Sequence, residues 1–232
     1  SRAPNHTWLI DLTTIPTGGG FWTPWLPFAL SQCWPFCWWV VVVLDHFSRK
    51  VIAAGLFAKQ PNALELCTVL DHAVRKAGRP PKYTITDQGP QFREEYDDWC
   101  SWHDVEPRFG ALGRHGSIAV IERFMRTMKQ EFLRRILVPY RRDDMAGALA
   151  SFTTWYNEHR PHGHLHGATP DEIYRGVRPA CEGPRFEPRP DYPCRRRKWH
   201  NLRAKKGTPL ALAITYVDGN PNLPIVELRA AA

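Results

Sequence analysis

The N-terminal part of the chain contains three apolar runs rich in β-branched and aromatic residues, each bounded by polar or turn-forming residues. Short runs of this composition are typical of β-strands, so the pattern predicts strands over residues 6–14, 38–45 and 51–57. No stretch with helical period separates these runs. Strands that follow one another without a crossover helix pair antiparallel, which favours a meander at the start of the fold.

Further along the chain, apolar positions recur with the period of an α-helix. Residues 62–77 are a clear case, because Asn62 can cap the start and Gly78 can end the helix. Similar patterns predict helices over residues 91–103, 117–137 and 143–158, and strands over residues 82–86 and 105–109. Strands separated by helices align in parallel. The sequence therefore predicts an α/β fold, with a mixed five-stranded sheet flanked by helices.

Residues 17–37 interrupt this pattern between the first two predicted strands. They combine a Gly18–Gly20 run and several prolines with Trp and Phe, which predicts an irregular insertion. Five of the ten tryptophans of the chain fall between Trp22 and Trp39. Two interpretations stay open: a loop that packs on itself or on a partner subunit, and a platform on which unpaired DNA bases stack.

The C-terminal part of the chain differs in composition from the rest. We expect one large domain over residues 1–180, a basic linker over 181–207 and a small β-hairpin over 208–232. Residues 185–206 carry nine Arg or Lys against two acids, and two apolar runs then flank an Asp-Gly-Asn turn. The first predicted strand begins almost at the first residue, so we expect the chain to be a fragment that lacks upstream segments.

Composition narrows the classes of function. A net charge of +8 and a pI near 9.4 favour a polyanionic partner. The six cysteines show no metal-binding or disulfide-framework spacing, and the longest apolar run, residues 38–44, is far shorter than the ~20 residues that a membrane helix needs. We therefore expect a cytoplasmic protein with reduced thiols and no membrane contact; the resemblance described below adds the expectation that it is bacterial and nucleoid-associated.

Three acids stand where they could meet. Asp11 and Asp87 each close an apolar run, and Glu122 lies in a stretch with helical period. Acids at strand ends and on a helix can converge and hold Mg²⁺, and two such ions promote phosphoryl transfer. Helical spacing also places Arg126 and Lys129 near Glu122. Each acid alone is more often a cap, a turn or a surface ion pair, so the trio is only a hypothesis at this point.

The sequence around these acids resembles the integrase catalytic core shared by retroviral-type integrases and bacterial insertion-sequence transposases. The resemblance runs from about residue 6 to residue 178. Its matching segments, in chain order, are residues 8–13 (WLIDLT), 45–50 (DHFSRK), 86–92 (TDQGPQF), 121–131 (IERFMRTMKQE) and 155–162 (WYNEHRPH). Five segments in the family's order are more specific than any one of them.

The resemblance implies an RNase H-like fold and a DNA transposase or integrase that cleaves element ends and transfers strands by phosphodiester transesterification. It implies that Asp11, Asp87 and Glu122 are the catalytic residues and hold two Mg²⁺ or Mn²⁺ ions. It also implies DNA as the partner, both transposon ends and target, and a homo-oligomer assembled on it. Asp45 opens a motif but is not a metal ligand in this mapping; we expect it to form a local turn or to pair with Arg49.

Basic residues are the candidates for contacts with DNA phosphates. Near the acids these are Arg123, Arg126 and Lys129, and in the basic linker they are Arg195, Arg196, Arg197 and Lys198. The histidines at 159, 162, 164 and 166 are interpreted as a hydrogen-bonded structural turn rather than a metal site.

Two other functions remain open from sequence. An RNase H or junction nuclease would share the fold and the carboxylates, and a domesticated DNA-binding protein would share the fold without the chemistry.

Overall fold

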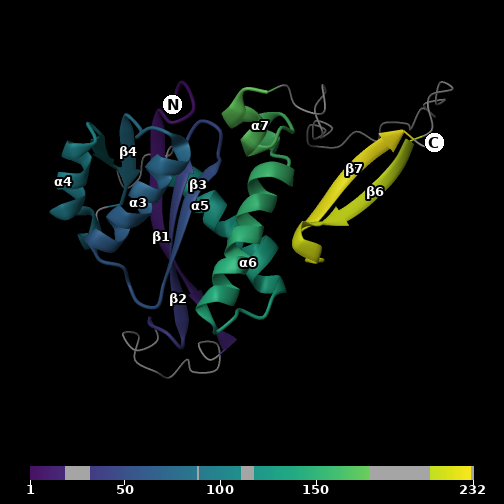
Figure 1. Cartoon of the computed structure of the whole chain (residues 1–232), viewed down its shortest axis with the longest axis horizontal. Helices are drawn as coiled ribbons and strands as arrows, with labels where there is room; N and C mark the ends of the chain where they lie inside the picture. Colours follow the sequence, from purple (N-terminus) through teal and green to yellow (C-terminus); the bar gives the residue numbers. More distant parts are fainter. Residues whose placement is uncertain (19–31, 88, 111–117, 178–209, 231–232) are drawn as a thin grey trace, which may run out of the picture.

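A mixed five-stranded sheet forms the centre of the molecule (Figure 1). The computed structural model describes residues 1–18, 32–87, 89–110, 118–177 and 210–230. The strand order is β3-β2-β1-β4-β5, and the first three strands are antiparallel while β4 and β5 run parallel to β1. The bounds are β1 (Thr7–Pro16), β2 (Cys37–Asp45), β3 (Val51–Phe57), β4 (Tyr83–Thr86) and β5 (Glu106–Phe109).

These strands confirm the predicted meander and the parallel additions. The main difference is the length of β1, which continues to Pro16 because β2 pairs with it as far as Cys37. Asp11 therefore lies in the middle of a strand, and the expectation that it stands at a strand end was wrong. The strand that ends beside it is β4.

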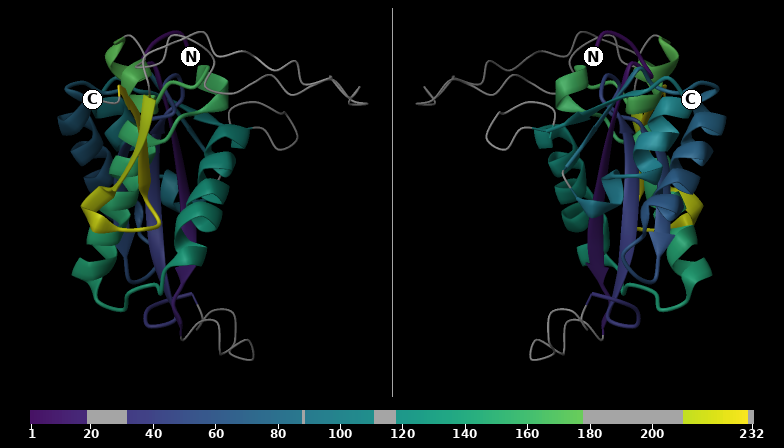
Figure 2. Two further views of the ribbon diagram at one scale, coloured as in Figure 1. Left: turned by 90° about the vertical axis from the view of Figure 1, so that its right-hand side faces the viewer. Right: turned by 90° about the vertical axis from the view of Figure 1, so that its left-hand side faces the viewer.

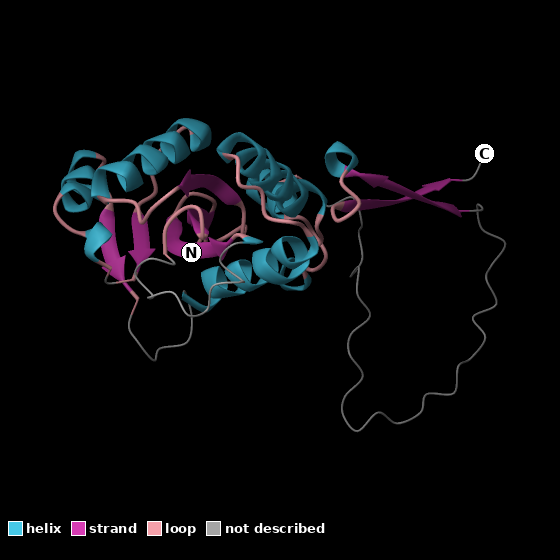
Figure 3. Cartoon of the chain, turned by 90° about the horizontal axis from the view of Figure 1, so that it is seen from below, coloured by secondary structure: helices cyan, strands magenta, loops and turns pink. Residues whose placement is uncertain are grey.

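Helices cover both faces of the sheet (Figures 2 and 3). On one face α3 and α4 pack with Trp8, Ile10 and Val43, and on the other α5 and α6 pack with Leu9 and Val42. Alternate residues of a strand point to opposite faces, so this split follows from the apolar residues at successive positions. The bounds are α3 (Ala63–Ala77), α4 (Glu95–Trp102), α5 (Ile118–Thr127), α6 (Arg142–Thr154) and α7 (Pro170–Arg175).

Helix α3 begins as the sequence predicts. The Asn62 side chain accepts a hydrogen bond from the Glu65 backbone N–H (2.8 Å), and the Glu65 carboxylate accepts one from the Asn62 N–H (2.9 Å). Gly78 ends the helix with a left-handed backbone (φ 75°), which glycine adopts without a steric penalty.

The two long helices predicted over residues 117–137 and 143–158 are each broken in the structure. Helix α5 changes into a π-turn, η2 (Met128–Phe132), and then into a short 3₁₀ turn, η3 (Leu133–Arg135). Helix α6 likewise ends in a π-turn, η4 (Trp155–His159). The spacing of apolar residues does not predict a π-turn, because a helix with one wider turn still directs its apolar side chains toward the core. Phe132 and Phe152 stack there, 4.9 Å apart.

The predicted C-terminal hairpin is present as β6 (Leu210–Tyr216) and β7 (Pro224–Ala230), beside α6 in Figure 1. One end of it is docked on the core: Leu223 is buried, and the Trp155 indole donates to the Pro224 carbonyl (2.9 Å). The basic linker and most of the Trp-rich insertion lie outside the described residues. At the edge of that insertion, the indoles of Trp34 and Trp38 donate to the carbonyls of Tyr140 (3.2 Å) and Pro139 (2.8 Å).

Two sequence-based expectations concern the surroundings of the fold. The side chains of Cys37, Cys67 and Cys100 are buried, as expected, and none of the three forms a disulfide with a described residue. No helix in the described part of the chain is both long and apolar enough to span a membrane.

The outer edge of β3 is secured by one side chain. Strand β3 is at the end of the sheet, and the buried Asn157 amide accepts from the Val51 N–H and donates to the Val51 carbonyl, both at 2.9 Å. The side chain thus substitutes for a missing neighbouring strand.

We expect Asn157→Ala to lower the free energy of unfolding by about 2–4 kcal/mol, because it leaves two buried backbone groups unpaired. Urea denaturation followed by circular dichroism measures the loss. Asn62→Ala is the matched control, and it should cost only about 1 kcal/mol as a lost cap. Equal losses in the two variants would contradict this role of Asn157.

Candidate active site

Asp11 and Asp87 lie side by side on one face of the sheet. Strands β1 and β4 pair in parallel with Leu9 opposite Ile85. Two residues further along each strand, the same register brings Asp87 beside Asp11. Because strand side chains alternate, both carboxylates point to the face that carries Leu9 and is covered by α5.

Asp87 follows the last residue of β4 and is exposed. One of its carboxylate oxygens accepts a hydrogen bond from the Gly89 N–H (3.1 Å), so the side chain closes the turn that ends the strand. Its other oxygen has no hydrogen bond to a described residue. Asp87 therefore stabilises the turn with one carboxylate oxygen and keeps the other oxygen available for a ligand.

Glu122 approaches from α5. It lines a cavity of about 390 Å³ whose opposite wall includes Asp11 and Thr13 of β1. Arg126 and Lys129 line the same cavity, as helical spacing predicts. The remaining lining residues are Met125, Gln130 and Arg134.

Arg134 is the lining residue that sequence reasoning missed. In an uninterrupted α-helix it would lie about 120° around the axis from Glu122. The turns η2 and η3 change that phase and return it to the cavity. Its sequence signal is only a basic pair, Arg134-Arg135, which is common on helix surfaces.

Burial and the charges of the other two acids both perturb the ionisation of Asp11. Its pKa is raised from 3.8 to about 6, first by burial and then by the negative charges of Asp87 and Glu122. The Leu12 N–H, which donates to the Asp11 carboxylate (2.8 Å), and the Lys129 charge act in the opposite direction. The three acids are thus close enough to sense one another.

The chemistry of this donor set suits a hard divalent cation. Carboxylate oxygens are the ligands that Mg²⁺ and Mn²⁺ prefer, and three of them converge here. Across the described residues, however, no group of three His, Cys, Asp or Glu side chains is drawn tightly enough to form a metal site. Carboxylates that repel one another are expected to close up only around a cation.

Asp45 does not compete for this role. It is fully buried, and its oxygens accept from the Asn5 N–H (2.9 Å) and from the Ser48 N–H and hydroxyl (2.8 and 2.6 Å). It is opposite Trp8 in the ladder, and hence on the face away from Asp11. The expected local turn is confirmed, while the Arg49 guanidinium donates instead to the His46 carbonyl.

Arg123 does not line the cavity of the three acids. It lies on another side of α5, where its guanidinium contacts the His164 imidazole (2.6 Å). It therefore does not share that cavity with Arg126 and Lys129, because one helical step turns a side chain by about 100°. Its contact with DNA phosphates stays a prediction. Glu131, further along the same segment, lies away from the cavity, and its carboxylate accepts from Nε and Nη2 of Arg160 at 2.8 and 2.6 Å.

Of the four clustered histidines, His162 is the one whose ring packs into the described structure. The His162 ring packs edge-on against Tyr156 (4.7 Å between centroids), and burial lowers its pKa to about 3. A neutral, buried ring of this kind fixes the turn after η4. Arg195, Arg196, Arg197 and Lys198 lie outside the described residues, so their contact with DNA stays a prediction.

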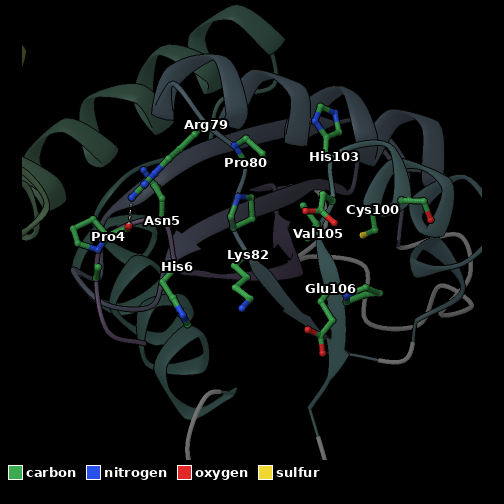
Figure 4. A pocket seen from close by; sticks show the side chains of 15 residues that line it. Pro4, Asn5, His6, Arg79, Pro80, Lys82, Cys100, His103, Val105 and Glu106 are labelled. Carbon is green, nitrogen blue, oxygen red and sulfur yellow. Dashed lines mark hydrogen bonds between the residues drawn. The ribbon is translucent and has the colours of Figure 1, made fainter.

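A wider cavity, about 820 Å³, lies at the end of the sheet where β1, β4 and β5 begin (Figure 4). The segment before β1, the α3–β4 connection and the corner before β5 form it, and Arg79 spans one side by donating to the Pro4 carbonyl (2.8 Å). It sits at the N-terminal ends of the parallel strands, whereas sites in such sheets form at the C-terminal ends. The acids meet at that C-terminal end.

This chain is similar to several known proteins. Two models of the family described as "Integrase core domain" match residues 1–115 and 103–170. The chain is 24% identical to the transposase of insertion sequence element IS904 from Lactococcus lactis over 75% of the chain and 62% of that protein. It is 27% identical to a 31.7 kDa protein of insertion element IS407 from Burkholderia multivorans over 78% of the chain and 60% of that protein. The chain therefore spans about three fifths of these relatives.

Solved structures show the same fold. The magnesium-bound catalytic core of HTLV-2 integrase superposes with a TM-score of 0.55 at 18% identity, over 75% of this chain and 98% of that one. A chain of the simian T-cell lymphotropic virus intasome, solved with a PP2A regulatory subunit, gives 0.58 at 19% identity over 97% and 67%. The predicted RNase H-like fold is confirmed.

The raised pKa of Asp11 predicts a pH-dependent stability. Between about pH 4 and pH 6 the folded protein retains a proton that the unfolded chain has released, so the free energy of unfolding falls as the pH rises. Asp11→Asn should escape this fall and exceed the wild type above pH 6 by about 1–3 kcal/mol. Urea denaturation from pH 4 to 7 tests it.

Asp104→Asn, at an exposed position away from the trio, is the control and should follow the wild type. Added Mg²⁺ at pH 7 should stabilise the wild type more than Asp11→Asn, because the cation relieves the repulsion. If the free energies of unfolding of the wild type and Asp11→Asn change with pH in the same way, Asp11 is not the acid with the raised pKa.

Proposed function

Because this chain belongs to the integrase core domain family, we propose that it is the catalytic core of an insertion-sequence transposase. The proposed reaction is DNA end cleavage followed by strand transfer, both by phosphodiester transesterification. The observation that carries the proposal is the convergence of Asp11, Asp87 and Glu122 beside a basic helix face.

We assign the three acids to metal binding. Asp11 and Asp87 offer oxygens from adjoining parallel strands, and Glu122 offers its carboxylate from α5. Two bound Mg²⁺ or Mn²⁺ ions would activate the attacking hydroxyl and stabilise the leaving oxygen. Because Asp11 is half-buried, its carboxylate is the one of the three whose ionisation depends most on the charge of a bound cation.

The basic residues of the cavity bind and orient the substrate. Arg126, Lys129 and Arg134 stand on the α5–η3 side, across from Asp11. Their charges offset those of the acids and hold backbone phosphates, which positions a phosphodiester between helix and strand. Thr13 is the one hydroxyl residue that lines the described cavity, and it is buried, so we propose direct attack without a covalent protein–DNA intermediate.

The wider context of the reaction is also a proposal. The relatives are bacterial insertion-element proteins longer than this chain, so we propose that transposon ends and target DNA of the bacterial nucleoid are its substrates. Dimeric and trimeric forms are named for the HTLV-2 core, which supports a homo-oligomer on paired ends. A simple nuclease with the same acids would hydrolyse DNA but would not join it.

The acid assignment is tested with the longest available form of the protein, Mg²⁺ and DNA carrying the element ends. We expect Glu122→Gln to lower nicking and joining by at least about 100-fold, because a residue that stabilises transition-state charge is lost. Gel analysis of end-labelled DNA measures both products. Glu158→Gln, at an exposed position outside the cavity, should retain full activity.

Activity that survives Glu122→Gln would contradict the assignment. Retained activity in Asp11→Asn together with loss in a folded Asp45→Asn variant would show that the first acid is Asp45. Nicking without any joined product would favour the nuclease function.

The basic linker predicts a salt-dependent contribution to DNA affinity. Replacing Arg195, Arg196, Arg197 and Lys198 by Gln in the intact chain should lower the slope of log affinity against log salt by about three to four, if each charge neutralises one phosphate. Fluorescence anisotropy with labelled duplex measures the slope between 50 and 300 mM salt, roughly. An unchanged slope would reject this role for the linker.

A further inference from the structure

A second set of cavities lies on another side of α5. One of about 580 Å³ is bounded by α5, η4 and the loop that follows, and a neighbouring one of about 520 Å³ reaches β1 and β4. Arg49 and Val120 line both, so the two cavities adjoin. We call them together the basic trough; the basic side chains that line it include Arg49, Arg108, Arg123 and Arg160.

The charge of the trough is one-sided. Among the described residues that line it there are four arginines and no acid. Arg160 is neutralised by Glu131 behind it, and Arg108 has a partly exposed partner, Glu106, at 3.4 Å. Arg49 and Arg123 form no salt bridge with any described residue.

Each of these two arginines, which form no salt bridge with a described residue, is held by one other contact. The Arg49 guanidinium donates to the His46 carbonyl, and the Arg123 guanidinium contacts the His164 imidazole. Each guanidinium has five N–H donors, so most donors of both remain for a ligand. Arg49 also has a left-handed backbone (φ 68°), which costs a non-glycine residue strain. Two fixed guanidinium groups around one cavity match the geometry of phosphate oxygens.

The shape of the trough favours a polymer over a single anion. Two joined cavities of this size exceed what one phosphate fills, and their walls include aromatic surface from Phe124, Tyr156 and Tyr83. The Arg108 guanidinium stacks on the Tyr83 ring at 3.7 Å. Arginines at the rim with aromatic rings between them suit alternating phosphates and sugars or bases.

The trough is separate from the cavity of the acids but adjoins it. Helix α5 stands between them, with Val120, Arg123 and Thr127 on one side and Glu122, Arg126 and Lys129 on the other. At its inner end the trough reaches Ile85, two residues before Asp87 on the same strand. A polymer strand bound in the trough would thus pass close to the carboxylates of the three acids.

We propose that the basic trough binds the sugar-phosphate backbone of a second DNA segment, distinct from the one at the acids, with Arg49 and Arg123 contacting its phosphates. This inference rests on the proposed function, since it assumes that DNA is the substrate. It assigns a recognition role to Arg49 and Arg123 and explains why Arg123 faces away from the acids.

Gly163 offers a clean test because it lines the trough and an added Cβ there meets no atom within 4 Å. Gly163→Asp introduces a negative charge without removing a contact, and Gly163→Asn introduces the same shape without charge. Gly147→Asp, at an exposed position of α6 with equal space, places the charge elsewhere. DNA binding is measured by anisotropy without divalent metal, so catalysis does not enter.

We expect Gly163→Asp to bind a duplex of element-end sequence about tenfold more weakly than Gly163→Asn at low salt, with the gap closing as salt rises. Gly147→Asp should bind like the wild type. The gap should grow with length from thymidine monophosphate to a long oligonucleotide, because a longer strand occupies more of the trough.

Equal affinities for Gly163→Asp and Gly163→Asn, with the wild type binding DNA normally, would overturn the trough and leave the proposed function intact. A full gap already present with thymidine monophosphate would identify a nucleotide pocket and overturn the strand path. A wild type that binds no DNA at any salt would overturn the proposed function and this inference together. Unchanged affinity in an Arg49→Gln/Arg123→Gln double variant would also reject the contacts named here.

Discussion

Strand β1 is paired on both sides, and this double pairing is the constraint on which the rest of the structure depends. Its antiparallel ladder with β2 extends through Pro16, whereas its parallel ladder with β4 stops at Leu9 and Ile85. Asp11 lies just beyond the end of the parallel ladder. One edge of β1 is therefore unpaired at Asp11, while β2 still pairs with the other edge. A carboxylate that is fixed by a sheet and open on one edge is positioned without the entropy cost that a loop residue would bear.

The alternation of side chains along β1 then decides what each neighbouring acid can do. Asp11 shares its face with Leu9 and with α5, while Asp45 shares the other face with Trp8. The first is left with a raised pKa near two other acids, and the second is fully satisfied by three donors. Two aspartates of similar local sequence thus differ because of a single step in strand register.

Helix α5 and the turn that continues it carry positive charge on two sides. One side carries Arg126 and Lys129 beside the acids, and the other carries Arg123 toward Arg49. The turns η2 and η3 extend this division, since they bring Arg134 back to the cavity of the acids. A regular helix of the same sequence would place Arg134 about 120° around the axis from Glu122.

The sequence by itself determined the strands and the caps, and it singled out three candidate acids. Apolar runs, the Asn62–Glu65 capping pair and the motifs around Asp87 and Glu122 act over a few residues, so local chemistry reports them. It could not place Asp11 within its strand, Arg123 away from Glu122, or Arg134 beside it. Those placements depend on which strand pairs with which and where a helix changes its turn, and both are set by packing between segments distant in sequence. Only the tertiary structure therefore decided that the positive charge forms two surfaces, one on each side of α5.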